Sequence, residues 1–214
     1  MSKQFLITLP SGDDAEYYLS IWSKEIIDVA AEKGFKVVKL EREKANRQAL
    51  EGHLKSSAPD FLVFNGHGDG KTICGHMQEP LIEENSNHAL LKGTVAYARS
   101  CYTLSSLGKA SVGSGCTAFI GYSAPFVFVS DPNSSARPLK DCLAYPCLYT
   151  SNMVPLALLK GANVETAVQK AKEKMAELIS EWETRDEREA TFVASCLFWD
   201  MNCLNFEGTG KATI

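Results

Sequence analysis

The chain has 214 residues, which is long enough to bury a sizeable core within one large domain. Hydrophobic residues make up 45% of it and charged residues 22%, proportions that are ordinary for a soluble globular protein. A net charge of −4 argues against nucleic acid or an anionic membrane as the main partner.

The cysteines and the first segment indicate the compartment. There are seven cysteines, an odd number without regular spacing, which is unlike a disulfide framework. Residues 1–10 contain too short an apolar core for a signal peptide, and no run approaches the roughly 18 apolar residues of a membrane span. We therefore expect a cytoplasmic protein with reduced thiols.

Strand and helix patterns alternate through the first half of the chain. Alternation of this kind predicts βαβ units, and hence an α/β fold in which helices flank a mostly parallel sheet as a three-layer sandwich. Short apolar runs predict strands at 3–9, 35–40, 60–65, 94–100 and 117–122, and helices are expected at 11–34, 43–57 and 104–115.

The second half is expected to be mainly helical. Residues 71–93 form a polar excursion, and residues 130–146 are the most loop-like segment. Helices are expected at 153–159 and 165–182, followed by a last strand or two within 192–206. No internal repeat or low-complexity linker divides the chain, so we expect a single domain spanning residues 1–214.

Two apolar runs end in reactive side chains. The strand pattern at 60–65 leads into Gly66-His67-Gly68, and the pattern at 94–100 leads into Cys101. Because the carboxyl ends of parallel strands lie on one edge of a sheet, an imidazole and a thiol should face each other there. A thiol nucleophile and an adjacent imidazole base are the two side chains that thiol-based acyl transfer requires.

The neighbouring residues suit the same chemistry. Glycine on both sides of His67 permits a sharp turn, and the amides of Gly68 and Cys101 could form a two-donor oxyanion hole. Arg99 points to the same side as Cys101 if the strand stays extended. We expect Arg99 and nearby helix amides to favour the thiolate form of Cys101.

These motifs resemble the caspase-like cysteine peptidases of clan CD, which include legumains, metacaspases, gingipains and bacterial CHAT domains. The likeness is closest to the CHAT and gingipain branch, in which a strand ends in a small residue, Cys and Thr, as in Ser100-Cys101-Tyr102-Thr103, with a later glycine such as Gly108. Residues 115–125 look like the family's next strand and residues 198–208 like its closing strand.

The resemblance implies roles for individual residues. His67 would be the catalytic base and acid, Cys101 the nucleophile, and the amides of Gly68 and Cys101 the oxyanion donors. The primary specificity pocket would use Arg99 and the Tyr122–Ser123 region. Relatives that prefer basic or Asn side chains carry an acidic residue at the Arg99 position, so arginine there suggests cleavage after Asp or Glu.

Other residues have simpler interpretations. Asp69 could bind substrate or orient His67, although a turn role is the plainer explanation. Cys74, His76 and His88 could be assembled with His67 into a zinc site, but no pair has the usual metal-ligand spacing. We expect no metal and no organic cofactor.

We therefore expect a cysteine endopeptidase that acts on a protein or peptide substrate, and we allow for a regulatory protein partner. One alternative keeps the fold without the activity, as a catalytically silent regulatory or interaction module. A small-molecule hydrolase or ligand-binding doubly wound domain lacks support, because the chain has no dinucleotide, Walker-type or Gly-x-Ser-x-Gly motif. Residues 130–146 are the candidate activation loop, but Asp131 and Arg137 precede proline, so no obligatory self-processing is expected.

Overall fold

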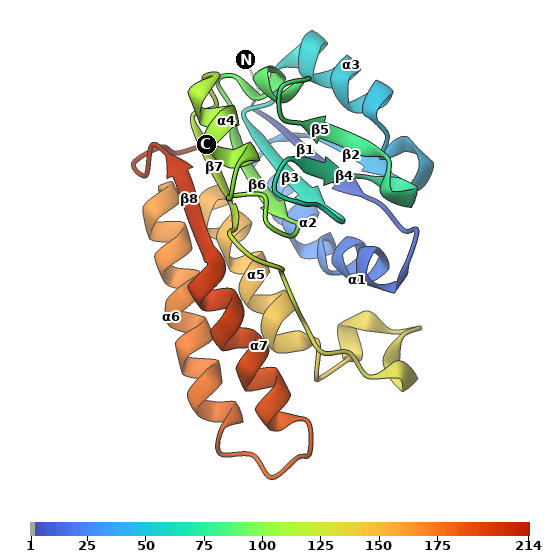
Figure 1. Cartoon of the computed structure of the whole chain (residues 1–214), viewed down its shortest axis with the longest axis vertical. Helices are drawn as coiled ribbons and strands as arrows, with labels where there is room; N and C mark the ends of the chain where they lie inside the picture. The colour runs from blue at the N-terminus through green and yellow to red at the C-terminus, as the bar shows by residue number, and fades with distance from the viewer. Residues whose placement is uncertain (1–2) are drawn as a thin grey trace.

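A six-stranded sheet in the order β2-β1-β3-β6-β7-β8 lies at the centre of the computed structural model, which describes residues 3–214 (Figure 1). All neighbouring strands are parallel except β7 and β8, which are antiparallel. The mostly parallel α/β architecture is confirmed. The strands are β1 (Gln4–Leu9), β2 (Lys36–Glu41), β3 (Phe61–Asn65), β6 (Val95–Arg99), β7 (Ala118–Tyr122) and β8 (Leu204–Gly208).

Helices cover both faces of this sheet. One face carries α1, α2, α5, α6 and α7, and the other carries α3, α4 and a small hairpin. The helices are α1 (Asp14–Trp22), α2 (Lys24–Glu32), α3 (Arg47–Ser57), α4 (Leu107–Gly113), α5 (Tyr145–Leu159), α6 (Val164–Trp182) and α7 (Ala190–Cys203). Short 3₁₀ turns are η1 (Arg42–Lys44), η2 (His76–Gln78), η3 (His88–Leu91), η4 (Pro132–Ser134) and η5 (Pro138–Lys140).

Strand β3 shows how the sequence builds this three-layer arrangement. Side chains alternate along a strand, so Phe61 and Val63 join the core beneath α5, α6 and α7. Leu62 and Phe64 join the opposite core beneath α3 and α4. All of these side chains are fully buried, which explains why the first four positions of the strand are apolar.

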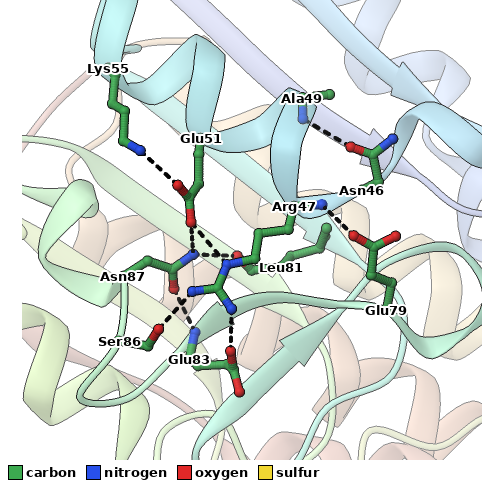
Figure 2. Close-up of polar contacts among 10 residues, drawn as sticks. All are labelled: Asn46, Arg47, Ala49, Glu51, Lys55, Glu79, Leu81, Glu83, Ser86 and Asn87. Atoms are coloured by element: carbon green, nitrogen blue, oxygen red, sulfur yellow. Dashed lines mark hydrogen bonds and ion pairs between the residues drawn. The ribbon is translucent and has the colours of Figure 1, made fainter.

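The polar excursion at 71–93 contains an antiparallel hairpin, β4 (Thr72–Cys74) and β5 (Pro80–Glu83), that the sequence did not predict. Its strands are short, and Glu83 at the end of β5 carries a charge. Figure 2 shows how α3 holds this hairpin: the guanidinium of Arg47 contacts Glu51 on its own helix and Glu83 on β5. Asn87 donates to both Glu51 and the carbonyl of Leu81.

Two predicted elements were wrong. Residues 11–34 are not one helix, because Ser23 donates its hydroxyl to the Leu19 carbonyl and separates α1 from α2. Residues 192–206 are mostly helix α7, with β8 only at the end. An apolar run does not by itself distinguish a buried strand from a helix.

Helix α5 begins at Tyr145, well before the predicted start, and accommodates Pro146 in its first turn. Figure 1 shows α5, α6 and α7 side by side. Within residues 3–214, no helix is long and apolar enough to cross a membrane.

Candidate active site

His67 and Cys101 lie at the carboxyl ends of neighbouring parallel strands. Asn65 of β3 pairs with Arg99 of β6. His67 lies two residues after Asn65, and Cys101 lies two residues after Arg99. Both side chains line one cavity of about 110 Å³. The rest of its wall comes from Ala15, Glu16, Leu19, Gly66, Arg99, Ser100, Phe126 and Phe128.

Glycine is required at two positions of the turn that carries His67. Gly66 has a φ of +134°, and a Cβ there would lie 2.6 Å from the Cys74 carbonyl oxygen. A Cβ at Gly68 would lie 3.0 Å from the Cβ of Ser100. The turn therefore packs directly against the residue that precedes Cys101.

The amides of Gly68 and Cys101 donate no hydrogen bond to any residue in the range 3–214. One belongs to the turn that follows β3 and the other to the turn that follows β6. Unpaired backbone donors beside a nucleophile are the groups that an oxyanion hole requires. Their predicted role is therefore compatible with the hydrogen bonding of the backbone.

Asp13 is a site residue that the sequence interpretation missed. Its Oδ2 lies 2.5 Å from Nε2 of His67, and its Oδ1 accepts the Glu16 amide as the N-cap of α1. Burial raises the pKa of Asp13, but the hydrogen bonds from the Glu16 amide and His67 outweigh it and lower the pKa overall. A charged carboxylate thus holds the imidazole and leaves Nδ1 available for proton exchange.

Cys101 is half-buried, and burial raises the pKa of its thiol. A hydrogen bond with the Phe126 backbone acts in the opposite direction, and the nearby Asp200 carboxyl raises the pKa further. The expectation of a lowered pKa was wrong. Residues 101–106 form turns and α4 begins only at Leu107, so Cys101 does not lie at the start of α4.

Arg99 is fully buried beneath the strand ends. Burial lowers its pKa to about 10, so the guanidinium is still charged at neutral pH. All five N–H groups have neutral acceptors, so none is left for a ligand. These acceptors are the side chains of Asn65, Ser151, Asn152 and Ser23 and the carbonyl of Leu19.

Glu16 brings a carboxyl group into the same cavity wall. Its exposed fraction is 1%, and Oε2 accepts the Gly12 amide. Oε1 has no hydrogen-bond partner within the described part of the chain. Burial raises the pKa of Glu16, the Gly12 amide lowers it, and the charge of Asp13 raises it again, with a net increase.

The other predicted substrate-binding residues do not line this cavity. Asp69 is exposed and its side chain accepts the Lys71 amide in a turn. Tyr122 is fully buried, whereas Ser123 is exposed and donates its amide to Cys203. Their roles in substrate binding stay predictions.

Phe126 and Phe128 in the cavity wall belong to residues 123–130, a segment that we call the strap. The amide of Val127 donates to Asp200 of α7, and the Trp199 indole donates to the Pro125 carbonyl. Phe126 and Phe128 of the strap also line a second cavity, of about 380 Å³, beside α1. Helix α7 therefore supports the segment that contacts Cys101.

The crystal structure of the Arg-specific cysteine proteinase gingipain R matches 99% of this chain, with a TM-score of 0.63 and 9% sequence identity. The fold is caspase-like. A complex of the Porphyromonas gingivalis RgpB pro- and mature domains matches 99% of the chain with a TM-score of 0.62, also at 9% identity.

The chain spans about half the length of these proteins, covering 47% of the first and 48% of the second. No family model matches the sequence, and no curated protein matches it. At this identity the likeness establishes the caspase-like fold alone, and it does not favour the CHAT branch.

Proposed function

We propose that the chain is a cysteine endopeptidase in which Cys101 is the nucleophile and His67 the general base and acid. One observation carries this proposal. The imidazole and the thiol line a single cavity at the sheet edge of a fold that gingipain R, a cysteine proteinase, shares.

The reaction follows from the order of groups around that cavity. The Cys101 sulfur forms a bond to the scissile carbonyl carbon while its proton passes to His67, and the amides of Gly68 and Cys101 stabilise the oxyanion. His67 then gives this proton to the leaving amine as the peptide bond breaks. His67 then takes a proton from water as it attacks the thioester and returns it to the Cys101 sulfur as the carboxylic acid leaves. Asp13 stabilises the imidazolium each time it forms.

For specificity, the carboxyl group of Glu16 in the cavity wall favours a basic side chain before the cleaved bond. The prediction of an acidic preference relied on Arg99, but an incoming carboxylate would have to displace one of its five acceptors. Glu16 has an unpaired carboxylate oxygen that an arginine or lysine could occupy. The description of gingipain R as Arg-specific supports the same choice.

The remaining parts of the proposal concern partners and location. The substrate is a protein or peptide, and the pro-domain bound in the RgpB complex supports a protein partner as a regulator. The cysteines of the chain are free, which supports a reducing compartment such as the cytoplasm.

The alternative is a regulatory or interaction module of the same fold without catalytic activity. It is favoured by the burial of Cys101, which raises the pKa of the thiol. A weakly ionised thiol reacts slowly unless substrate binding aligns it with His67. Under this alternative, a peptidyl acyloxymethyl ketone would not label Cys101 in the purified protein.

A peptide library digested by the wild type, Cys101→Ala and Cys74→Ala, and analysed by mass spectrometry, tests the proposal. We expect cleavage after Arg or Lys by the wild type and Cys74→Ala, and none by Cys101→Ala. Cys74 is a partly buried thiol outside the cavity, so its variant is the matched control. Cleavage that survives in Cys101→Ala would refute the proposal, and faster cleavage after Asp or Glu would support the Arg99 prediction instead.

A further inference from the structure

Three side chains beside the nucleophile form a cluster of metal-ligand type. Asp13, Glu16 and His67 each offer one ligand atom, and these atoms all lie within 4.8 Å of one another. None of Cys74, His76 and His88 belongs to this group. An imidazole nitrogen with two carboxylate oxygens is a donor set that suits Zn²⁺, whereas Ca²⁺ and Mg²⁺ prefer oxygen ligands alone.

Glu16 supplies a second and independent observation. Its side chain is almost completely buried, yet Oε1 has no hydrogen-bond partner in residues 3–214. An unpaired polar atom in such a place is costly, so few native structures keep one without a ligand or water. A cation bound at this oxygen would remove that cost.

The backbone already orients both carboxylates. The Gly12 amide holds Oε2 of Glu16, and the Glu16 amide holds Oδ1 of Asp13. Outer contacts of this kind fix ligand direction in metal sites. They leave Oε1 of Glu16 without a partner, whereas Oδ2 of Asp13 and Nε2 of His67 contact each other and would exchange that contact for the ion.

The exposure of the cluster suits an ion that binds from solvent. The side chains of His67 and Asp13 are 39% and 44% exposed, so one side of the site is open. A water could fill the fourth position of a tetrahedral ion there. Arg99 lies in the same cavity wall, and its charge opposes the ion, although all of its N–H groups are directed to neutral acceptors.

We propose that Asp13, Glu16 and His67 bind one Zn²⁺ ion per chain and that the bound ion inhibits the enzyme. The ion replaces the hydrogen bond between Asp13 and His67 at Nε2, and the ring proton of the neutral imidazole is then on Nδ1. Nδ1 can therefore no longer accept the proton of Cys101. The inhibitory part rests on the proposed peptidase function, but the metal site does not.

Binding is tested without any substrate. The metal-free protein is titrated with Co²⁺, followed by its visible absorption, and with Zn²⁺ by calorimetry. We expect one saturable site in the wild type, and affinity at least about tenfold weaker in Glu16→Gln and in His67→Asn. Glu32→Gln, at an exposed position of α2, should bind as the wild type does. Circular dichroism confirms that each variant is folded, and Asp13→Asn provides a third ligand variant.

The Cys101→Ala variant tests whether the Cys101 sulfur is a ligand of the bound metal. Its affinity should equal that of the wild type, and no sulfur-to-cobalt charge-transfer band should appear. Loss of binding in Cys101→Ala, or equal binding in folded Glu16→Gln, would overturn the proposal.

A protein that binds Zn²⁺ but cleaves no peptide would keep the site and refute only the peptidase function. In an active protein, Zn²⁺ should abolish cleavage and a chelator should restore it.

Discussion

Asp13 connects the start of a helix to the reactive imidazole. One oxygen caps α1 and the other holds His67, so the two functions belong to different atoms of one carboxylate. Asparagine caps helices as well as aspartate does, whereas it carries no charge to stabilise an imidazolium. The residue therefore allows the two functions to be separated by a single substitution.

Asp13→Asn should lower kcat by roughly 10²-fold or more, with KM changed little, because the imidazolium formed during attack loses its counter-charge. Steady-state kinetics on a basic peptide substrate measures this. Asp14→Asn, on an exposed neighbour in the same turn, is the control and should keep its kcat. Equal losses in both variants would mean that the helix start, and not the carboxylate on His67, was disturbed.

The Cys101 thiol should ionise only at high pH in the free protein. Burial raises its pKa, so less thiolate is present at neutral pH than for an ordinary cysteine, whose pKa is about 8.5. Iodoacetamide alkylation of Cys101, followed by mass spectrometry, should therefore rise with pH along a curve whose midpoint exceeds that of a cysteine in a reference peptide. A midpoint below the reference would show that His67 and Cys101 form an ion pair at rest.

At the scale of elements, the hairpin β4–β5 supports the turn that carries His67. The Cys74 amide donates to the His67 carbonyl, and the Arg47 and Glu51 network attaches the hairpin to α3 (Figure 2). Hydrogen bonds from Lys55, Arg47 and Asn87 lower the pKa of Glu51 to about 2. The network is thus stable while Glu51 is charged.

Glu51→Gln should lower the free energy of unfolding by about 1 kcal/mol at neutral pH, since the contacts are partly exposed and screened by solvent. The folded pKa lies below the unfolded value of about 4.3, so the contribution is complete above that value. It is lost as pH falls through about 2. Urea unfolding at neutral pH and near pH 2 measures this, with Glu32→Gln as the control. A difference that persists unchanged in acid would contradict the assignment.

Elements whose apolar residues follow one clear pattern could be predicted from the sequence. The five parallel strands of the sheet were predicted in this way. The apolar runs before His67 and Cys101 also placed both residues at one sheet edge. Helix α7 was misassigned because a mostly apolar run fits a buried strand as well as a helix.

The acidic residues of the site could not be predicted in the same way. Asp13 and Glu16 look like an ordinary helix start, and Asp13 meets His67 only after a separation of 54 residues. Arg99 was placed at the cavity, but its five hydrogen bonds depend on β3, α1, Ser23 and α5 packing around it. Such contacts have no local signature.

At the scale of the whole molecule, Asp200 links α7 to the strap and is fully buried. Burial raises the pKa of this carboxyl well above its usual range, and its Oδ2 has no partner within residues 3–214. Because the pKa of Asp200 is raised in the folded protein, its contribution to the free energy of unfolding is complete below the unfolded pKa of about 3.9. That contribution is lost as the pH rises through the folded pKa.

Asp200→Asn should remove that decline, because asparagine has no proton to lose. The free energy of unfolding of the variant, relative to the wild type, should be higher at pH 7 than at pH 4, as measured by urea unfolding. Asp186→Asn, at an exposed position, should show no such dependence on pH. The same relative stability at both pH values would show that Asp200 is charged in the folded state.

The antiparallel edge of the sheet has a consequence for biosynthesis. The amide and hydroxyl of Ser123 donate to the carbonyl of Cys203, which lies 80 residues further along the chain. The free edge of β7 is therefore covered only after α7 and β8 have been synthesised. A polypeptide still on the ribosome would already contain both reactive groups without the support that α7 gives to the strap. The proteolytic activity that we propose should therefore arise only after residues 190–208, which form α7 and β8, have joined the fold.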